Sequence, residues 1–278
     1  LSTQVASASY SVISGGYGNT ASGINSFVGG GYGNSASNQY AVTCGGLTNT
    51  ASNTSCAVVG GYLNSATGQY SVIGGGFNNT SSGNYSAVFG GSANTSSGNT
   101  SFVGGGVSNT ASGSYASVVG GGYGTTRSIN GQSSISACVG PIAFTNGVSQ
   151  SGLLLLGVVT TTAASTVLRS NTSAAGTTNQ VILPNNSAYY FKGSVIANVT
   201  GGGNTKAWSF EGAIKRGTTA ASTAIVGTVV LNTIAQDAGA AAWTISVTAD
   251  TTNGGLAVTV TGAASTTIRW VAKVETTE

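Results

Sequence analysis

The fifteen residues from Tyr70 to Asn84 are Tyr-Ser-Val-Ile-Gly-Gly-Gly-Phe-Asn-Asn-Thr-Ser-Ser-Gly-Asn, and this phrase recurs along the first half of the chain. One Asn of the phrase returns at a constant step of fifteen residues: Asn19, Asn34, Asn49, Asn64, Asn79, Asn94 and Asn109. A Gly pair keeps the same step from Gly15-Gly16 to Gly120-Gly121, while Gln4 with Ala6-Ser7 forms a worn first copy. A fixed step without insertions is the signature of a repeat architecture. The sequence therefore predicts a β-solenoid with one coil per fifteen-residue repeat.

Each repeat contains one five-residue strand, such as residues 70–74, in which alternate side chains point to opposite sides. One side pairs a small residue with a β-branched one, as expected for the narrow interior of a coil. Examples are Ser26 and Val28, Cys56 and Val58, Ser86 and Val88, and Ala116 and Val118. The Gly pair predicts a corner with positive φ. The Asn residues can either occupy the left-handed region at a second corner or form a ladder of stacked amides.

The other side of this strand is apolar as well. It carries Val12, Phe27, Val42, Val72 and Phe102, flanked by Tyr10, Tyr40, Tyr70, Tyr85 and Tyr115. A strand that is apolar on both faces is normally buried on both, and a single solenoid would expose this stripe along its whole length. We therefore expect self-association along the solenoid, and a closed ring around a three-fold axis would hide the stripe by placing Val12, Phe27, Val42, Val72 and Phe102 at the trimer interface.

The composition argues against an enzyme. Charged residues make up 5% of the chain, against about 25% in an ordinary domain. His, the commonest general base and metal ligand, is absent, and the three Cys residues lack zinc-site spacing. Pairing of Glu211 with Asp237 or Asp250 as catalytic acid and base would be an accident of the fold. We expect no catalytic residues, no cofactor and no metal.

The distribution of charge and hydropathy excludes two classes of partner. All thirteen charged residues lie between Arg127 and Glu278, and no basic cluster forms a patch for phosphates, so we expect no binding to nucleic acid. The best apolar run, residues 152–159, is far too short to span a bilayer, so we expect no membrane insertion.

The second half of the chain has a different pattern. The phrase 136–140 repeats the strand once more, and residues 141–152 form a predicted junction. Period-two strands follow, in which charges take the face without aromatic residues. All three Trp residues then belong to a core, and outward-facing Tyr190 and Lys192 are weak candidates for receptor contact. We predict β-roll repeats over 1–140 and a β-sandwich domain over 153–278.

The phrase at 70–84 resembles the head repeat of trimeric autotransporter adhesins, the YadA-like heads, which have a Ser-Val-Ala-Ile-Gly phrase followed by small residues ending in Gly. The resemblance covers residues 4–140 and implies a left-handed parallel β-roll assembled as a trimer. The family's usual step is about one residue shorter, and its Ala-rich corner is Gly-Gly in this chain. Phage tail fibres use similar rolls, and residues 153–278 resemble the β-sandwiches that end tail fibres and tailspikes of tailed phages.

These resemblances imply a trimeric phage tail fibre or tailspike in the virion tail, with no enzymatic activity. Its expected partners are host cell-surface glycan or outer-membrane protein, together with other virion tail proteins. A bacterial trimeric adhesin head is the first alternative, although the chain shows no heptad stalk. The second alternative is an ice-binding solenoid, because Thr20-x-Ser22, Thr50-x-Ser52 and Thr80-x-Ser82 form regular hydroxyl rows.

Overall fold

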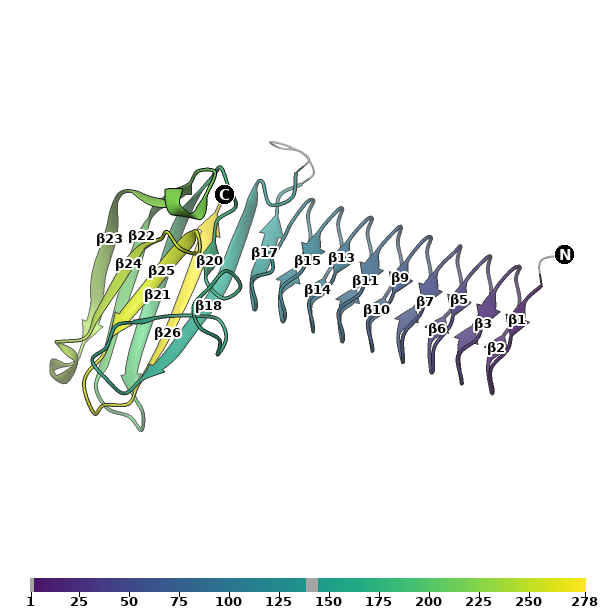
Figure 1. The fold of residues 1–278 in the computed structure, drawn as a ribbon, viewed down its shortest axis with the longest axis horizontal. Helices are drawn as coiled ribbons and strands as arrows, with labels where there is room; N and C mark the ends of the chain where they lie inside the picture. The colour runs from purple at the N-terminus through teal and green to yellow at the C-terminus, as the bar shows by residue number, and fades with distance from the viewer. Residues whose placement is uncertain (1–2, 139–144) are drawn as a thin grey trace. The chain divides into compact units, whose positions relative to one another are not determined.

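The computed structural model describes residues 3–138 and 145–278, so residues 141–144 of the predicted junction lie outside the described residues. The described chain is all-β and begins with a solenoid of about nine turns (Figure 1). It divides into two units, residues 1–128 with 133–150, and residues 129–132 with 151–278. We call them the solenoid and the C-terminal unit.

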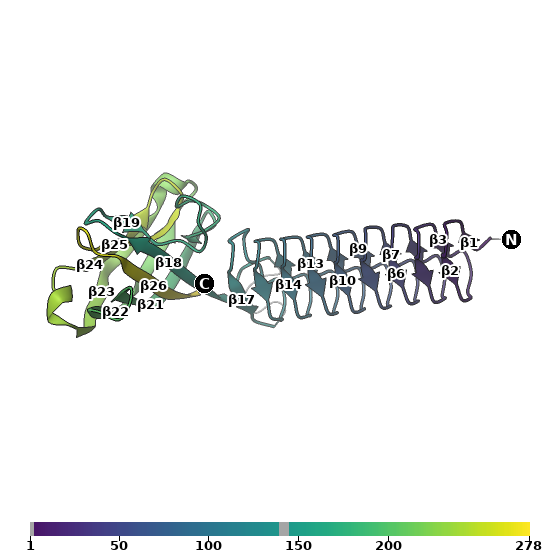
Figure 2. The same cartoon turned by 90° about the horizontal axis from the view of Figure 1, so that it is seen from below.

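From β1 to β16, each coil of the solenoid contributes one two-residue strand to each of two parallel sheets (Figure 2). The single five-residue strand expected at 70–74 is therefore wrong: only Val72–Ile73 is a strand, and Tyr70 has left-handed backbone. The first sheet contains β1 (Val5–Ala6), β3 (Thr20–Ala21), β5 (Ser35–Ala36), β7 (Thr50–Ala51), β9 (Ser65–Ala66), β11 (Thr80–Ser81), β13 (Thr95–Ser96) and β15 (Thr110–Ala111). The second contains β2 (Val12–Ile13), β4 (Phe27–Val28), β6 (Val42–Thr43), β8 (Ala57–Val58), β10 (Val72–Ile73), β12 (Ala87–Val88), β14 (Phe102–Val103), β16 (Ser117–Val118) and β17 (Ser133–Ser136). From β1 to β16, each residue pairs with the one fifteen positions further along, as Val72 does with Ala87. Equivalent residues of successive coils therefore stack into columns.

The interior of the coils holds the small and β-branched residues that the strand pattern assigned to it. Val28, Cys56, Val58, Val88 and Val118 have no exposed surface. Where Ser replaces Ala in the first sheet, the opposite side chain is also Ser, and the two hydroxyls bond: Ser81 to Ser86 and Ser96 to Ser101, each at 2.7 Å. These buried hydroxyls thus find partners inside the coil, as buried polar groups require.

The Asn column forms a hydrogen-bonded ladder and does not occupy the left-handed region. The Asn64 side chain is buried, and its Oδ1 accepts a hydrogen bond from the backbone N–H of Asn79 at 3.0 Å. Its Nδ2 donates to the carbonyl oxygens of Gly60 at 2.9 Å and Gly76 at 3.0 Å. Each side chain thereby satisfies backbone groups of its own coil and of the next one.

The left-handed residues lie elsewhere in the repeat. One column runs through Tyr70, Tyr85 and Tyr115, all with φ near +58°, and another through the residue that precedes each Asn. Left-handed backbone costs a non-Gly residue about 1–2 kcal/mol. It also directs the backbone N–H toward the preceding coil, where Tyr85 donates to the Gln69 carbonyl at 2.9 Å. The corner after the second sheet uses Gly, because a Cβ at Gly91 (φ +84°) would collide with the carbonyl oxygen of Gly106.

The ladder ends at residue 124. The N–H of Gly124 still donates to Asn109 Oδ1 at 2.7 Å, but Gly124 has no side chain to continue the column. The side chain of Gln150 then accepts from the Thr125 N–H at 2.9 Å and donates to its carbonyl at 3.1 Å. The next strand, β17, covers residues 133–136 and so shares only Ser136 with the strand phrase predicted at 136–140, of which residues 139–140 lie outside the described residues. It pairs Ser117 with Ser133, a step of sixteen.

The C-terminal unit contains two antiparallel sheets. One has the order β18 (Gln150–Thr160), β26 (Ile268–Thr277), β21 (Ser187–Val199), β22 (Thr205–Arg216) and β23 (Ala224–Gln236). In the other, β25 (Gly255–Thr261) pairs with β19 (Thr166–Val167), β20 (Val181–Ile182) and β24 (Thr244–Asp250). Two 3-10 turns, η1 (Ala220–Ser222) and η2 (Ala238–Ala240), flank β23. β18 begins at Gln150, inside the range expected to be a junction.

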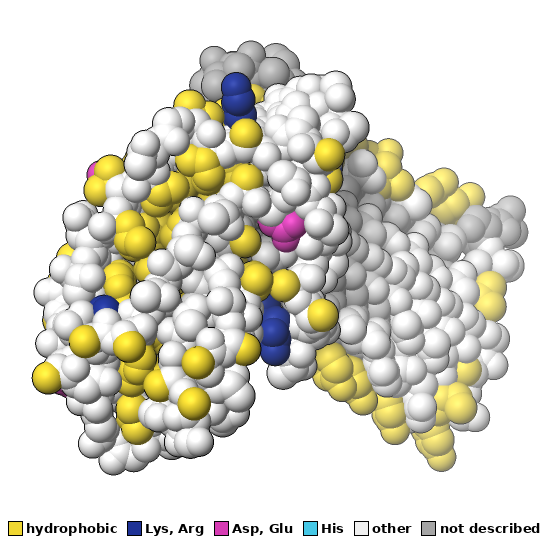
Figure 3. All heavy atoms as spheres, turned by 60° about the vertical axis from the view of Figure 1, so that its left-hand side comes forward, with side chains coloured by type: hydrophobic (Ala, Val, Ile, Leu, Met, Phe, Trp, Pro, Cys, Tyr) yellow, Lys and Arg dark blue, Asp and Glu magenta, His cyan; other side chains and the backbone are white. Residues whose placement is uncertain are grey.

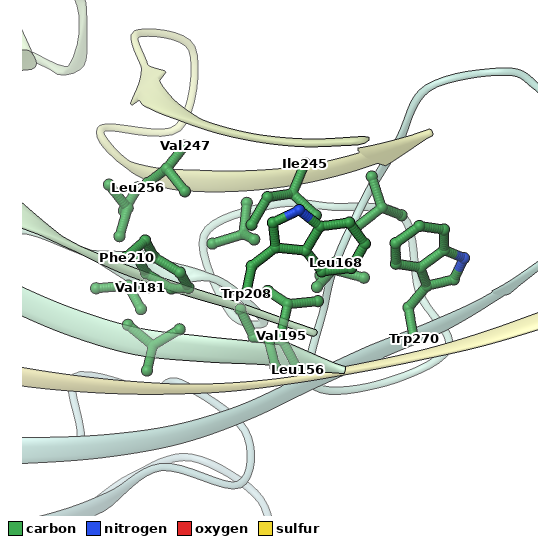
Figure 4. Packing of buried hydrophobic residues seen from close by; sticks show 14 of the residues in the cluster. Leu156, Leu168, Val181, Val195, Trp208, Phe210, Ile245, Val247, Leu256 and Trp270 are labelled. Atoms are coloured by element: carbon green, nitrogen blue, oxygen red, sulfur yellow. The ribbon is translucent and has the colours of Figure 1, made fainter. Parts of the chain in front are cut away.

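All three Trp residues are buried in one hydrophobic cluster to which both sheets contribute (Figure 4). The rings of Trp208 and Trp270 stack with centroids 5.8 Å apart, and Trp243 lies 6.0 Å from Trp270. The indole N–H of Trp270 donates to the Thr160 hydroxyl at 2.9 Å, so this buried polar group is satisfied. The expected assignment of all three Trp residues to a core is confirmed.

Truncating one rung of the Asn ladder should destabilise the solenoid strongly. Asn94→Ala removes the groups that bond the Gly90 and Gly106 carbonyls and the Asn109 N–H. Unpaired buried polar groups cost roughly 1–3 kcal/mol each, so we expect a loss of about 3 kcal/mol or more in the free energy of unfolding. The matched control is Asn99→Ala, five residues away and exposed. Denaturant unfolding followed by circular dichroism compares the variants, and equal midpoints would refute the ladder's role.

Candidate functional site

Four charged residues of the C-terminal unit, Lys192, Glu211, Lys273 and Glu275, lie on the outward side of the neighbouring strands β26, β21 and β22, and uncharged β23 continues the same sheet. Along β21 the side chains of Tyr189, Phe191 and Val195 are buried, so those of Tyr190 and Lys192 project outward. This alternation placed both residues on the outer face from sequence, and the structure agrees. We call the outward residues around Lys192 the charged face: Tyr190, Lys192, Ser194, Ser209, Glu211, Val230, Asn232, Lys273 and Glu275.

Strand register arranges the charged face in two rows. In one row Glu275, Lys192, Glu211 and Val230 are direct cross-strand neighbours on β26, β21, β22 and β23. In the adjacent row Lys273, Ser194, Ser209 and Asn232 follow the same order. Opposite charges directly across an antiparallel pair attract, whereas like charges destabilise it. In the first row Lys192 lies between Glu275 and Glu211, so both of its cross-strand neighbours carry the opposite charge.

Hydrogen bonds and ion pairs fix the long side chains of this face. Nζ of Lys192 lies 3.1 Å from Glu275, and Nζ of Lys273 lies 2.7 Å from the same carboxylate. The Tyr190 hydroxyl donates to Glu211 Oε2 at 2.9 Å. Hydrogen bonds from Lys273 and Lys192 hold the pKa of Glu275 below its usual range. The same contact with Glu275 raises the pKa of Lys192, and bonding to Glu211 raises the pKa of Tyr190.

A cavity of about 400 Å³ opens on this face. It is lined by Lys192, Gly193, Ser194, Ser209, Phe210, Glu211, Val230, Asn232, Lys273 and Glu275. Gly193 has no side chain, and a Cβ there would collide with the ring of Phe210 and the Lys273 carbonyl. The lining combines two Lys, two Glu, two Ser and one Asn, so it offers both donors and acceptors and its formal charges cancel.

Sequence reasoning found Tyr190 and Lys192 but missed the partners that complete the cavity. Glu211, Lys273 and Glu275 are not among the contact residues that the sequence predicts, although all three line the cavity. The alternation along 268–274 showed that these charges share an outward face. What the sequence lacked was the strand order, which places β26 directly beside β21.

The solenoid carries a second candidate surface, the column through Val12 that was predicted as a trimer interface. Val12, Phe27 and Val72 are exposed in the single chain, and Val42 and Phe102 are half-buried. The flanking Tyr10, Tyr40, Tyr70, Tyr85 and Tyr115 are exposed as well. The chain by itself therefore leaves this apolar column uncovered.

A further apolar column escaped the sequence analysis. It follows the Gly corner and consists of Tyr17, Tyr32, Leu47, Tyr62, Phe77, Ser92, Val107 and Gly122, joined by a third row of parallel bridges. The rings of Tyr17 and Tyr32 stack at 5.2 Å, and those of Tyr62 and Phe77 lie 5.3 Å apart. Figure 3 shows hydrophobic side chains along two margins of the solenoid with polar atoms between them. The fifteen-residue spacing of these residues was the signal that could have revealed this column.

The remaining candidates from the sequence are the hydroxyl rows and three carboxylates, of which Glu211 lies on the charged face and Asp237 and Asp250 do not line its cavity. The hydroxyl rows of Thr20, Ser22 and their equivalents belong to the first sheet and to the residue that follows each of its strands. Asp237 Oδ2 accepts from the Thr205 N–H at 2.8 Å, and Asp250 accepts from Thr252 and Asn253 in its own turn. Glu211 bonds Tyr190. Each of these three carboxylates thus has its own local partner.

Within the described residues, no three His, Cys, Asp or Glu side chains gather as metal ligands, and no helix is long and apolar enough to cross a membrane. Lys206 is a buried cation whose pKa is lowered by desolvation. Its ammonium donates to the carbonyls of Ala241 at 3.1 Å and Trp243 at 2.8 Å, which anchors the segment after η2.

No protein-family model and no curated protein matches this sequence. Among solved structures, the chain is similar to the tailspike protein of Acinetobacter phage vB_ApiP_P1, at 11% sequence identity and a TM-score of 0.20. The match covers 91% of this chain and 55% of that chain, so this chain spans about half the length of the tailspike. A likeness at this level assigns neither a family nor an activity.

The ion pair at Lys192 makes a prediction about its titration. Glu275→Gln removes the carboxylate that bonds the ammonium and should lower the pKa of Lys192 toward its ordinary value, because the charged form loses its main stabilising partner. Glu211→Gln is the matched control, since Glu211 acts on Lys192 only through space and should lower this pKa less. Titration of the Lys192 side-chain resonances by NMR measures both variants, and equal effects would contradict the pairing.

Proposed function

We propose that this chain is a receptor-binding protein of a tailed phage, a homotrimeric tail fibre or tailspike that mediates host recognition and adsorption. In this proposal the YadA-head-like solenoid is a stiff spacer within the virion tail. The C-terminal unit, a β-sandwich, contacts a host cell-surface glycan or outer-membrane protein and catalyses no reaction. The observation that carries the proposal is the pair of uncovered apolar columns along a solenoid that holds no charge in residues 1–126.

Those columns support association of like chains. Only a partner with the same coil repeat can match an apolar residue in nearly every coil, and another copy of this chain has that repeat. A cyclic ring larger than a dimer joins two different patches of each subunit, whereas a two-fold dimer uses one patch twice. The Val12 column and the Tyr17 column are two different patches. Three copies agree with the trimer implied by the resemblance to YadA-like heads.

The charged face supports the recognition step. Carbohydrate hydroxyls both donate and accept hydrogen bonds, and the cavity around Lys192 offers Lys and Asn donors beside Glu and Ser acceptors. Exposed Tyr190 adds an aromatic surface with a polar end at the margin. Because its two Lys and two Glu balance, the cavity fits an uncharged, hydroxyl-rich ligand better than a polyanion. We therefore favour host glycan as the receptor class.

Charge placed in the Val12 column should disrupt assembly. Val72→Asp combined with Phe102→Asp would bury two unpaired carboxylates in each interface, so we expect at least a tenfold weaker association. Thr80→Asp introduces a charge on the outward side of the first sheet, away from both apolar columns, and should leave the trimer intact. Sedimentation velocity over a concentration series reports the result. A wild-type chain that stays monomeric at micromolar concentration would refute the trimer.

The charged face should carry adsorption. Purified trimer is expected to bind host cells and to protect them from the phage that bears it. Tyr190→Ala with Lys192→Ala should reduce both effects at least tenfold, whereas Lys215→Ala, an exposed lysine of the same sheet outside the cavity, should retain them. Binding of the double variant at wild-type strength would remove this face from the proposal. Release of reducing sugar from host polysaccharide would overturn the non-enzymatic assignment.

A further inference from the structure

One edge strand of the C-terminal unit, β23, has a backbone edge that no other strand of the described chain pairs with. β23 is the last strand of its sheet and spans thirteen residues, Ala-Ile-Val-Gly-Thr-Val-Val-Leu-Asn-Thr-Ile-Ala-Gln. Within the described part of the chain, β22 pairs with one of its edges and no strand pairs with the other. An unpaired edge presents a row of backbone N–H and C=O groups that can bond another chain.

β23 lacks the side chains that usually protect such an edge. Natural edge strands are often short, or they carry Pro or charged residues such as Lys. β23 is thirteen residues long and contains neither Pro nor a charged residue. Its pairing with β22 is irregular at two places, between Ala207 and Trp208 and between Glu211 and Ala213. At the first of these irregularities, Ile234 has no partner on β22 and is 64% exposed. A charged residue at this bulge would have protected the edge, but the position holds an apolar side chain.

Both faces of β23 expose apolar side chains. Val226 and Val230, which pair with residues of the outward row, are 47% and 48% exposed. Leu231 pairs with buried Phe210 and so points toward the second sheet, yet it remains 42% exposed. Figure 3 shows hydrophobic side chains scattered among polar ones on the face of the C-terminal unit that is turned to the viewer. In this unit β23 lies against β24. An apolar pattern on both faces is typical of a strand buried on both sides.

We propose that β23, with the apolar surface beside it, is a second self-association surface, covered by the C-terminal unit of another copy of this chain. This inference rests on the self-association in the proposed function and extends it from the solenoid to the C-terminal unit. The neutrality of β23 fits an uncharged surface of another copy of this chain, because the strand would bury no unpaired charge there. A strongly charged partner would instead require complementary charges on this strand.

The estimated areas of β23 and of a solenoid column can be compared with the area that a stable interface buries. Thirteen strand residues extend about 43 Å, and a strip about 10 Å wide along them covers roughly 430 Å². Eight coils at about 4.8 Å give each solenoid column about 380 Å² by the same measure. A standard stable interface buries about 800 Å² per partner. Each region alone gives about half of that area, so a stable assembly needs more than one contact surface per subunit.

The test uses the full chain and a matched pair of substitutions. Val226→Asp on β23 is compared with Val271→Asp on β26, a valine that is 50% exposed on the charged face's sheet and lies away from β23. We expect Val226→Asp to weaken association at least tenfold in sedimentation velocity and Val271→Asp to leave it unchanged. Hydrogen exchange on the wild-type chain should show β23 amides protected in the assembly and exposed on dilution to monomer.

The outcomes separate this inference from the proposed function. If the chain assembles while β23 exchanges rapidly and Val226→Asp has no effect, the inference is wrong and assembly through the solenoid stands. If the chain is monomeric at all accessible concentrations, both fail. If β23 becomes protected only when another virion tail protein is added, the occupant is that protein and self-association at β23 is overturned.

Discussion

The solenoid depends on the buried amide ladder that joins each coil to the next. One Asn side chain satisfies two Gly carbonyls and the backbone N–H of the following Asn, so a single residue type fixes the path of two coils. The bonds require the same side chain at the same place in every coil, which explains the unbroken step of fifteen. The stacking of equivalent residues also explains why the solenoid repeats contain no charged side chains. In a stack with equivalent residues about 4.8 Å apart, a charged side chain would meet its own copy in each neighbouring coil.

The narrow coils also leave apolar side chains exposed on the outside of the chain. Coils this narrow bury one small and one β-branched residue from the second sheet, and the outward residues of that strand must find cover elsewhere. The Val12 and Tyr17 columns are the result in the solenoid, and β23 is the corresponding element in the C-terminal unit. In the solenoid the backbone hydrogen bonds are largely made within the chain, whereas β23 leaves one backbone edge unpaired within the described residues. Both units keep apolar side chains exposed, which supports the proposed self-association.

The charged face has a different origin. It is built from residues far apart in sequence that antiparallel register brings into line, with Lys192 between Glu211 and Glu275. The exposed ion pairs contribute little to stability because solvent screens them. Their consequence is geometric, since they hold long side chains around a cavity whose donors and acceptors are balanced. Stability of the unit comes instead from the Trp cluster on the opposite side of the sheet.

The sequence by itself determined the solenoid repeat, the residues of its interior and the faces of the strands that carry Tyr190, Trp208 and Trp270, because these depend on periodicity alone. It did not predict the strands at 150–160 and 224–236. Ser86, Val88 and Trp208 were placed correctly by counting residues in steps of two and fifteen. Two properties had to come from the tertiary structure. The Asn column had two sterically acceptable conformations, and only the position of the neighbouring coil's carbonyls decided for the ladder. The partners of Lys192 depended on strand order, because pairing between β21 and β26 joins segments about eighty residues apart that no local pattern relates.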